Sequence, residues 1–296
     1  MNPLQFVVLY RDTLVNRPFD FDFPHTWSSD GTTEAHETLE RSRGADIVIT
    51  NKVVISAQAF AENPQLKLVA VTATGVNNVD VEAAKQNGTV VCNIRAYGNE
   101  SVAEHAFMMM ITLMRNLPAY QRDVAAGLWE NSPFFCHLGA PMRDLNGKTL
   151  AIFGRGNIGK TLATYAQAFK MNVVFAEHKN AQSVRDGYIS FEEAIRSADV
   201  VSLNCPLTPQ TANMIGEAEL QQMKPGAILI NCGRGGMVDE AALVAALKYG
   251  QIGGAGFVVL RQEPPSVGNA VSFTHVRASE THAHTVCRIQ LDKTKT

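Results

Sequence analysis

Residues 149–179 read TLAIFGRGNIGKTLATYAQAFKMNVVFAEHK, and this stretch predicts the fold of the second half of the chain. An apolar run, a glycine-rich turn, a helical pattern and a second apolar run follow one another, which is the order strand, turn, helix, strand. Gly154, Gly156 and Gly159 form the pattern G-x-G-x-x-G. In such units the glycines allow a sharp turn, the approach of a pyrophosphate and close packing of the helix on the strand. The stretch therefore predicts a dinucleotide-binding unit, against the alternative that its glycines only form a tight turn.

The second apolar run of this stretch ends on an acidic residue, Glu177. It follows Gly159 at close to the spacing, about 20 residues, at which an acidic side chain accepts a hydrogen bond from a cofactor ribose. A carboxylate at that position repels the 2′-phosphate of NADP and therefore favours NAD. His178 and Lys179 beside it would instead attract that phosphate. The sequence therefore favours NAD as the cofactor and leaves NADP open.

The composition narrows the class of protein. A chain of 296 residues suits two domains, and 46% hydrophobic with 18% charged residues is typical of folded rather than disordered chains. The formal net charge of −2 provides no basic surface for nucleic acid or for an anionic membrane. No apolar run reaches the roughly 18 residues that a membrane-spanning helix needs. We therefore expect a small-molecule substrate, with neither nucleic acid nor membrane as a partner.

The five cysteines are scattered singly, without a C-x-x-C pair. Such a set is typical of reduced thiols in a cytoplasmic protein rather than of a disulfide framework or a zinc site. Arg11 and Asp12 come too early for a signal peptide. We therefore expect a cytoplasmic protein without a metal site.

Strands alternate with helices along the chain, which predicts an α/β fold with two doubly wound parallel sheets, Rossmann-like or flavodoxin-like, and a cleft between the two domains. Outside the opening stretch the predicted strands are 5–10, 45–50, 66–72, 89–93, 200–204, 227–232 and 256–260. The predicted helices are 33–43, 57–62, 80–86, 99–128, 190–197, 217–223 and 240–249. The helix over 99–128 is apolar around most of its girth, so we expect it to be covered by a dimer interface, by a domain junction or by the core.

Several predicted strands end in loops that carry polar or small residues. Three of these loops, over 204–208, 231–236 and 261–265, should open on the same edge of the sheet as the glycine turn. Arg234 lies between glycines, and its guanidinium can hold a carboxylate through two parallel hydrogen bonds, or it forms a surface salt bridge. The loop over 72–80 carries Thr74 and Gly75, and either offers backbone N–H groups to an anionic substrate or only caps a helix.

Three ordered motifs, over 154–159, 223–239 and 263–265, together resemble the D-isomer-specific 2-hydroxyacid dehydrogenase family. The segments 176–179 and 100–105 resemble its glycerate dehydrogenase, or hydroxypyruvate reductase, branch. The resemblance covers residues 5–269. It implies a substrate domain, flavodoxin-like, over 1–98 and an NAD(P)-binding Rossmann domain over 99–285, in an enzyme that is expected to be a homodimer.

The resemblance also implies roles for individual residues. Arg234 matches the arginine that holds the substrate carboxylate and polarises the carbonyl, and Glu263 matches the glutamate that makes a catalytic histidine more basic. Thr74 and Gly75 match the substrate loop. The cofactor-binding positions are Gly154, Arg155, Gly156, Asn157, Ile158, Gly159, Glu177, His178, Cys205, Pro206, Cys232, Gly233, Arg234 and Val258.

Two departures from the family qualify this interpretation. Val258 stands where the family has an aspartate near the nicotinamide carboxamide, and it cannot accept that hydrogen bond. Beyond residue 269 the family has a proline followed by its catalytic histidine, and this chain has no such pair. His284 is the best match to the catalytic acid and His282 is the second. The alternative is that either one is an ordinary surface histidine. Residues 286–296 form a short divergent tail in place of the family's return helix, from which we expect lower stability. The resemblance thus predicts oxidation and reduction of a small 2-hydroxy acid such as glycerate, against the alternative of an impaired dinucleotide-binding regulatory or scaffolding protein.

Overall fold

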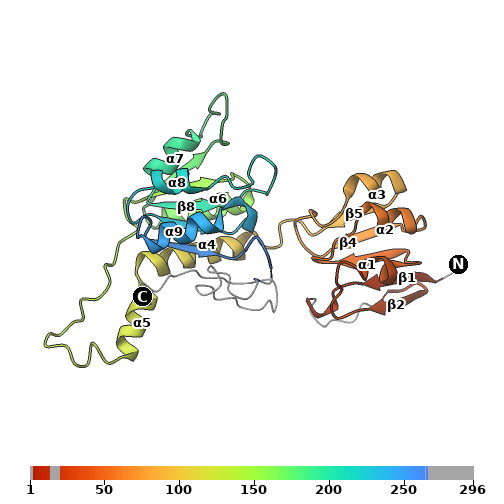
Figure 1. Ribbon diagram of the computed structural model, residues 1–296, viewed down its shortest axis with the longest axis horizontal. Helices are drawn as coiled ribbons and strands as arrows, with labels where there is room; N and C mark the ends of the chain where they lie inside the picture. Colours follow the sequence, from red (N-terminus) through yellow and green to blue (C-terminus); the bar gives the residue numbers. More distant parts are fainter. Residues whose placement is uncertain (1–2, 14–20, 264, 266–296) are drawn as a thin grey trace. The chain divides into compact units, whose positions relative to one another are not determined.

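The computed structural model describes residues 3–13, 21–263 and 265 of the chain. Their contacts divide them into two compact units, the first ending at Tyr97 and the second beginning at Gly98. Each unit contains one five-stranded sheet, and the strands within each sheet pair in parallel (Figure 1). The predicted α/β fold with two parallel sheets is therefore confirmed.

The first unit has the strand order β2-β1-β3-β4-β5. Its strands are β1 (Leu4–Val8), β2 (His25–Ser29), β3 (Ile47–Thr50), β4 (Leu68–Val71) and β5 (Val90–Asn93). Its helices are η1 (Arg11–Thr13, a 3₁₀ turn), α1 (Thr38–Ser42), α2 (Ala57–Glu62) and α3 (Val81–Asn87). The sequence places α2 correctly, because Ser56 caps it by accepting a hydrogen bond from the N–H of Ala59.

The two faces of this sheet are packed differently. One face forms a core with α1, α2 and α3, in which Phe60 and Val69 are fully buried. The other face carries Phe6, which stacks on Phe21 at 4.9 Å and on Trp27 at 5.5 Å between ring centroids. Aromatic rings rather than helices therefore cover this face over the part of the unit that the structure describes.

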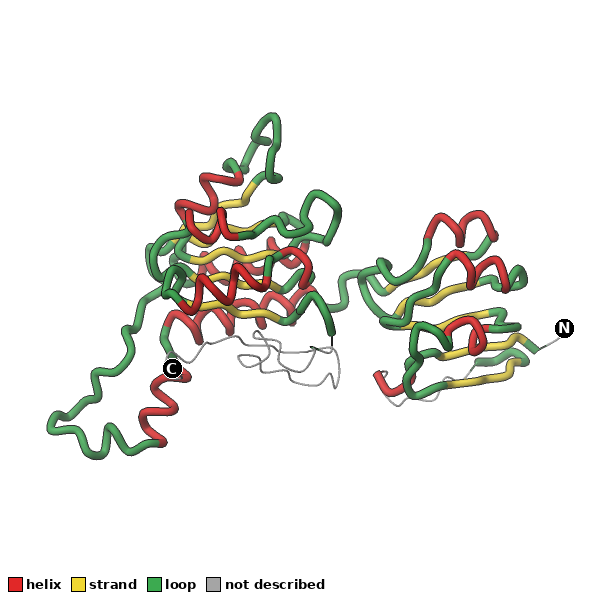
Figure 2. Tube along the Cα trace, in the orientation of Figure 1, coloured by secondary structure: helices red, strands yellow, loops and turns green. Residues whose placement is uncertain are grey.

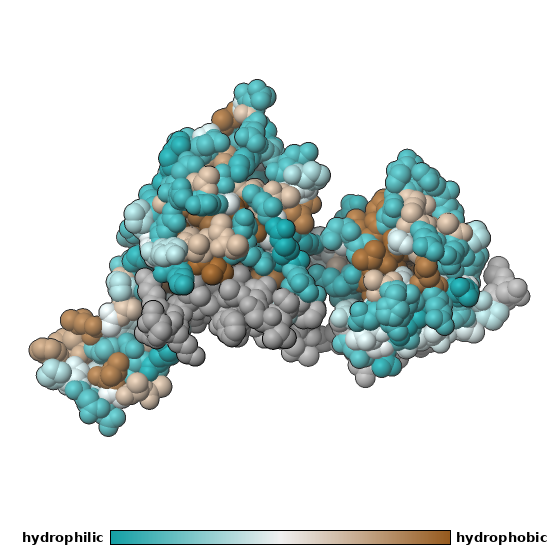
Figure 3. All heavy atoms as spheres, viewed as in Figure 1, coloured by the Kyte–Doolittle hydropathy of each residue, from teal (hydrophilic) through white to brown (hydrophobic). Residues whose placement is uncertain are grey.

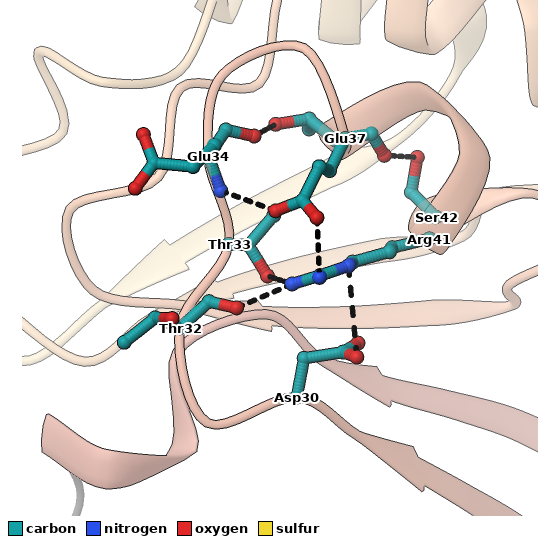
Figure 4. A network of polar contacts seen from close by, with 8 residues as sticks. Asp30, Thr32, Thr33, Glu34, Glu37, Arg41 and Ser42 are labelled. Carbon is teal, nitrogen blue, oxygen red and sulfur yellow. Dashed lines mark hydrogen bonds and ion pairs between the residues drawn. The ribbon is translucent and has the colours of Figure 1, made fainter.

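Sequence analysis missed β2 and extended α1 too far toward the N-terminus. The strand β2 is short and its outward residues are polar, so the pattern HTWSS lacks the apolar run of a buried strand. The segment after it is held by Arg41, whose guanidinium donates to Glu37 at 2.6 Å and to the hydroxyl of Thr33 at 2.8 Å (Figure 4). The same guanidinium lies 3.6 Å from Asp30, so one arginine joins the end of β2 to α1.

The second unit has the strand order β10-β9-β8-β6-β7. Figure 2 shows its strands in yellow, with helices in red around them. Its strands are β6 (Thr149–Phe153), β7 (Asn172–Ala176), β8 (Val200–Leu203), β9 (Ile228–Asn231) and β10 (Gly254–Phe257). Its helices are α4 (Asn99–Met114), α5 (Leu117–Ala125), α6 (Asn157–Ala168), α7 (Phe191–Ser197), α8 (Glu217–Gln222), η2 (Gly235–Met237) and α9 (Glu240–Lys248).

Helices cover both faces of this sheet (Figure 1). On one face α4 and α6 pack on β6, β8 and β9, and the buried side chains there include Met109 and Leu162. On the other face α7, α8 and α9 bury Ile195, Leu220 and Leu243. The strands β6, β8, β9 and β10 are almost wholly buried, as expected for a parallel sheet between helices, while the edge strand β7 is partly exposed.

Two predicted elements of this unit are wrong in their bounds. The helical pattern over 99–128 is two helices, because Asn116 adopts a left-handed conformation with φ of 49° and α5 then begins at Leu117. The last strand lies at Gly254–Phe257 rather than at 256–260, and the N–H of Val258 still donates to the carbonyl of Asn231 in β9 at 3.1 Å. The core buries Met109 and Met110 of α4, while Met108 remains 44% exposed.

None of the helices in the described residues is both long enough and apolar enough to cross a membrane.

Candidate functional site

The strand β6 has β7 on one side and β8 on the other, so the connections after β6 and β8 leave the sheet in opposite directions. In open parallel sheets, ligands bind at the carboxyl ends of the strands at such a switch point. A pocket of about 280 Å³ lies there. Its lining consists of Phe153, Gly154, Arg155, Gly156, Ala176, Glu177, His178, Lys179, Arg185, Tyr188, Asn204, Cys205, Pro206, Gln210, Thr211 and Met214.

The glycine turn after β6 forms one wall of this pocket. Gly154 has a φ of +110°, and a Cβ there would lie 2.8 Å from the backbone of Asn204. A Cβ on Gly159 would lie 2.1 Å from the carbonyl oxygen of Gly154, so the first turn of α6 packs directly against the turn. Both positions therefore exclude larger residues, and their close packing brings the start of α6 to the pocket.

The N-terminus of α6 provides donors for an anion. Gly156 is the N-cap and has no side chain to accept from the N–H groups of the first turn, which belong to Asn157, Ile158 and Gly159. The space above Gly156 is open, because a Cβ added there would meet no heavy atom within 4 Å. Free donors at the positive end of a helix favour a phosphate, so the turn fits the diphosphate of a dinucleotide.

Glu177 follows β7, and its side chain is only 3% exposed. Its Oε1 accepts from the N–H of His178 at 2.8 Å and from Nη2 of Arg185 at 2.7 Å. Its Oε2 accepts from Nε of Arg185 at 2.7 Å and from the N–H of Arg185 at 3.2 Å. These hydrogen bonds, with those from the Arg185 side chain foremost, lower the pKa of Glu177 to about 2.

Four donors fill the lone-pair positions of the Glu177 carboxylate. Glu177, which the sequence predicts as the acceptor for a ribose hydroxyl, lines the pocket, and in this conformation both of its carboxylate oxygens already accept hydrogen bonds. A ribose hydroxyl would have to replace one of the donors that the carboxylate already has.

Cationic side chains form the outer wall of the pocket. The guanidinium of Arg155 lies over the rings of Phe175 and Tyr188, at 4.8 Å and 5.3 Å from their centroids. The guanidinium of Arg185 also lies over Tyr188, 4.2 Å from the centroid of its ring. Lys179 is turned away to Glu219, at 2.7 Å, and the His178 side chain is 72% exposed.

The loop after β8 forms the inner wall. The thiol of Cys205 lies 3.5 Å from the sulfur of Met237, and burial raises the pKa of Cys205 to about 11, so the thiol stays neutral. The Oδ1 of Asn204 is buried, and it has no hydrogen-bond partner among the residues that the structure describes. This oxygen is therefore an acceptor beside the region where a nucleotide would bind.

The loop after β9 carries Arg234 and is organised by Asn231, which is fully buried. The side chain of Asn231 accepts from the N–H of Gly233 at 3.0 Å and donates to the carbonyl of Arg234 at 2.9 Å. Nη1 of Arg234 donates to the carbonyl of Gly233 at 2.8 Å. Cys232, Gly233 and Arg234 thus lie at the carboxyl end of β9, outside the lining of the pocket.

Other predicted site residues lie elsewhere in the two units. Glu263 accepts from the N–H of Leu260 at 2.9 Å, and Val258 packs against the core formed by α4 and α6. Thr74 and Gly75 belong to the first unit, where the side chain of Asn93 donates to the carbonyl of Thr74 at 2.7 Å. The candidate acids His284 and His282, and the tail over 286–296, lie outside the described residues.

Sequence reasoning did not find all of the pocket. It did not name Phe153, Ala176, Arg185, Tyr188, Gln210, Thr211 or Met214 as site residues, and it placed Asn204 there only as part of the loop over 204–208. Arg185 and Tyr188 reach the pocket because their segment runs beside β7, where the N–H of Glu177 donates to the carbonyl of Ile189 at 2.9 Å. No local motif marks this segment, so only the pairing with β7 identifies it.

A second hollow of about 480 Å³ lies between α4 and α6. Its lining is mainly apolar and includes Phe107, Met108, Ile111 and Phe169. This lining contains no glycine turn and no helix N-terminus, so it offers no place for a diphosphate. The pocket at the switch point is therefore the candidate site.

The sequence of this chain matches a family model described as "D-isomer specific 2-hydroxyacid dehydrogenase, NAD binding domain" over residues 107–282. A glycerate dehydrogenase of Methylorubrum extorquens is 44% identical over 264 residues, which cover 89% of this chain and 83% of that protein. A hydroxypyruvate reductase of Blautia hydrogenotrophica is 35% identical over 78% of this chain and 73% of its own.

Among solved structures, the TT0316 protein from Thermus thermophilus superposes with a TM-score of 0.76. It is 31% identical, and the match covers 91% of this chain and 86% of that one. The names of the two enzyme relatives describe a dehydrogenase and a reductase, and give no support to the alternative of a regulatory or scaffolding protein.

Proposed function

Because this chain belongs to the D-isomer specific 2-hydroxyacid dehydrogenase family and is an NAD-dependent oxidoreductase, we propose that it interconverts a small 2-hydroxy acid and its 2-keto acid. Hydroxypyruvate and glyoxylate are the keto acids that we propose first. A relative that is 44% identical is named glycerate dehydrogenase, and others are named hydroxypyruvate reductase and glyoxylate reductase.

The observation that supports this proposal most strongly is the pocket at the switch point. The open space above Gly156 and the free donors at the start of α6 fit a diphosphate, and Asn204 offers a buried acceptor beside it. Bound NAD would supply the hydride for reduction of the keto acid, or accept it in the reverse direction. The chain's own residues would hold the cofactor, bind the substrate carboxylate and transfer a proton.

We propose Arg234 as the residue that binds the substrate carboxylate and polarises the carbonyl. Asn231 fixes the loop through two hydrogen bonds, which leaves the guanidinium at the carboxyl end of the sheet. A guanidinium binds a carboxylate through two parallel hydrogen bonds. Thr74 and Gly75 of the first unit are proposed to bind the same anion through their backbone N–H groups.

The proton would come from a histidine, and His284, or His282, is the proposed acid. Glu263 is the proposed partner that favours the charged imidazolium. Val258 provides no side-chain acceptor for a nicotinamide carboxamide, so another group must orient that end of the cofactor. We assign residues 1–98 to substrate binding and residues 99–285 to NAD(P) binding.

Steady-state oxidation of NADH with hydroxypyruvate and with glyoxylate tests the proposal. Arg234→Ala should lower kcat/KM by about 100-fold or more, because a charged contact to the substrate is removed. Arg234→Lys keeps the charge but loses the paired geometry, so it should retain part of the activity. Cofactor affinity, measured by calorimetry, should change little in either variant. Equal kcat/KM values for Arg234→Ala and the wild type would refute the assignment.

We also propose a cytoplasmic homodimer. Among the described residues, Cys92, Cys136, Cys205 and Cys232 form no disulfide, which is typical of proteins in a reducing compartment. The segment after α5, over 126–146, extends away from the sheet of its unit and carries apolar residues on its surface (Figures 1 and 3). Phe135 is 94% exposed and Leu138 is 86% exposed. Exposed apolar patches of this kind mark interaction surfaces.

A further inference from the structure

The outer wall of the pocket carries more positive than negative charge. Its lining includes the cations Arg155, Lys179 and Arg185, the exposed His178, and one carboxylate, that of Glu177. Lys179 is paired with Glu219 beside the lining, whereas Arg155 and Arg185 stack on aromatic rings over the pocket. The charge here therefore favours an anionic group on the ligand.

The carboxylate that would repel such a group is already bound. Both oxygens of Glu177 accept from Arg185, and the backbone N–H groups of His178 and Arg185 fill the remaining positions. Arg185 uses Nε and Nη2 for this contact, and a guanidinium has five N–H donors in all. Arg185 thus neutralises Glu177 and keeps further donors for a ligand, while its side chain remains 53% exposed.

We infer that Arg185 sets the cofactor selectivity of this enzyme: by engaging Glu177 it makes the pocket accept an adenosine 2′-phosphate, so that NADP(H) binds as well as NAD(H). The inference rests on the proposed function, because it needs the adenosine of a dinucleotide to lie in this pocket. It adds Arg185 as the residue that decides between NAD(H) and NADP(H), a choice that the sequence pattern alone leaves open.

Isothermal titration calorimetry of the full chain with two nucleotides tests this inference without catalysis. The probes are adenosine 5′-monophosphate and adenosine 2′,5′-bisphosphate, which differ only in the 2′-phosphate. In the wild type the bisphosphate should bind at least as tightly as the monophosphate. Arg185→Ala should shift the ratio of the two dissociation constants by about tenfold in favour of the monophosphate, because a charged donor is lost and Glu177 is released.

A second variant covers the case in which Arg185→Ala fails to fold. Glu177→Gln removes the negative charge and keeps the shape of the side chain, so it should shift the ratio in favour of the bisphosphate. Arg196→Ala is the matched control, since Arg196 lies on α7 and donates to Gln222 at 3.4 Å outside the pocket. Its ratio should equal that of the wild type.

The outcomes separate this inference from the proposed function. Tighter binding of the monophosphate than of the bisphosphate in the wild type would overturn the inference alone. An unchanged ratio in both Arg185→Ala and Glu177→Gln would overturn it too. If neither nucleotide bound the wild type, the nucleotide site itself would be refuted, and the inference with it.

Discussion

Glu177 shows how one contact changes the meaning of a sequence motif. Its position at the end of β7 could be predicted from the spacing after the glycine turn, because that spacing is set by the length of one helix and one strand. Its partner could not be predicted. Arg185 lies eight residues further along, and it meets Glu177 only because the intervening segment returns beside β7.

The lowered pKa of Glu177 predicts how stability depends on pH. A carboxylate whose pKa is about 2 in the folded protein and 4.5 unfolded stabilises the fold above pH 4.5, and this contribution is lost as the pH falls toward 2. Glu177→Gln removes the titrating group. We therefore expect the wild type to exceed the variant in stability at pH 7, and the difference to shrink between pH 4.5 and pH 2.

Urea unfolding followed by circular dichroism over this pH range measures the difference. Glu217→Gln is the control, because Glu217 lies exposed on α8, where it accepts from Gln221 at 2.9 Å. The stability difference between this control and the wild type should vary little with pH. A difference for Glu177→Gln that stayed constant from pH 7 to pH 2 would contradict the ion pair as described.

The junction between α4 and α5 is the main place where an element differs from its prediction. The apolar pattern continues through the break, so hydropathy alone predicts one helix. The break depends on Asn116, which takes a left-handed conformation, and on Pro118, which suits the first turn of a new helix. Asparagine tolerates this conformation better than most residues, but that tendency is too weak to identify a break from the sequence.

Substitutions at Asn116 should therefore reverse the usual order of helix propensity. Asn116→Ala should lower the free energy of unfolding by about 1–2 kcal/mol, because alanine carries the full cost of the left-handed conformation. Asn116→Gly should cost less, although both variants lose the hydrogen bond from the Asn116 side chain to the carbonyl of Pro141.

Thermal and urea unfolding of these two variants measures the order. Glu104, exposed within α4, provides the comparison, because there Glu104→Gly should be less stable than Glu104→Ala by about 1 kcal/mol. If the glycine variant were less stable than the alanine variant at both positions, the left-handed conformation of Asn116 would not be what separates the two helices.

Prediction of the strands depended on whether their apolar residues form a recognisable run. The pattern of β6, β8 and β9 is continuously apolar because helices cover both sides of the sheet. The edge strand β2 has polar outward residues and was missed. The strand β10 contains two glycines, and the bulky residues after it shifted the predicted strand toward the C-terminus.

At the scale of the whole molecule, the two sheets have the same topology but differ in the turn that follows their first strand. Both have their first strand between the second and the third, but only the second unit has a glycine turn at that switch point. The sequence therefore distinguished the nucleotide unit from its partner by one motif. The residues proposed to bind substrate could not be derived in the same way, since Gly75 and Arg234 belong to different units and no local pattern links them.

The projecting segment over 126–146 predicts the oligomeric state. Its hydrogen bonds include those from Trp129 Nε1 to the carbonyl of Phe135 at 3.2 Å and between His137 and Asp123 of α5 at 2.8 Å, and they leave the side chains of Phe135 and Leu138 exposed. Leaving Phe135 and Leu138 in water is unfavourable by about 25 cal/mol per Å² of apolar surface, so a dimer in which a second copy covers them would be more stable.

Wild-type protein should therefore sediment as a dimer at micromolar concentration, and the double variant Phe135→Glu, Leu138→Glu should sediment as a monomer. Tyr249→Glu, at an 83% exposed aromatic residue after α9, should remain a dimer. A dimeric double variant or a monomeric wild type would exclude this segment as the interface.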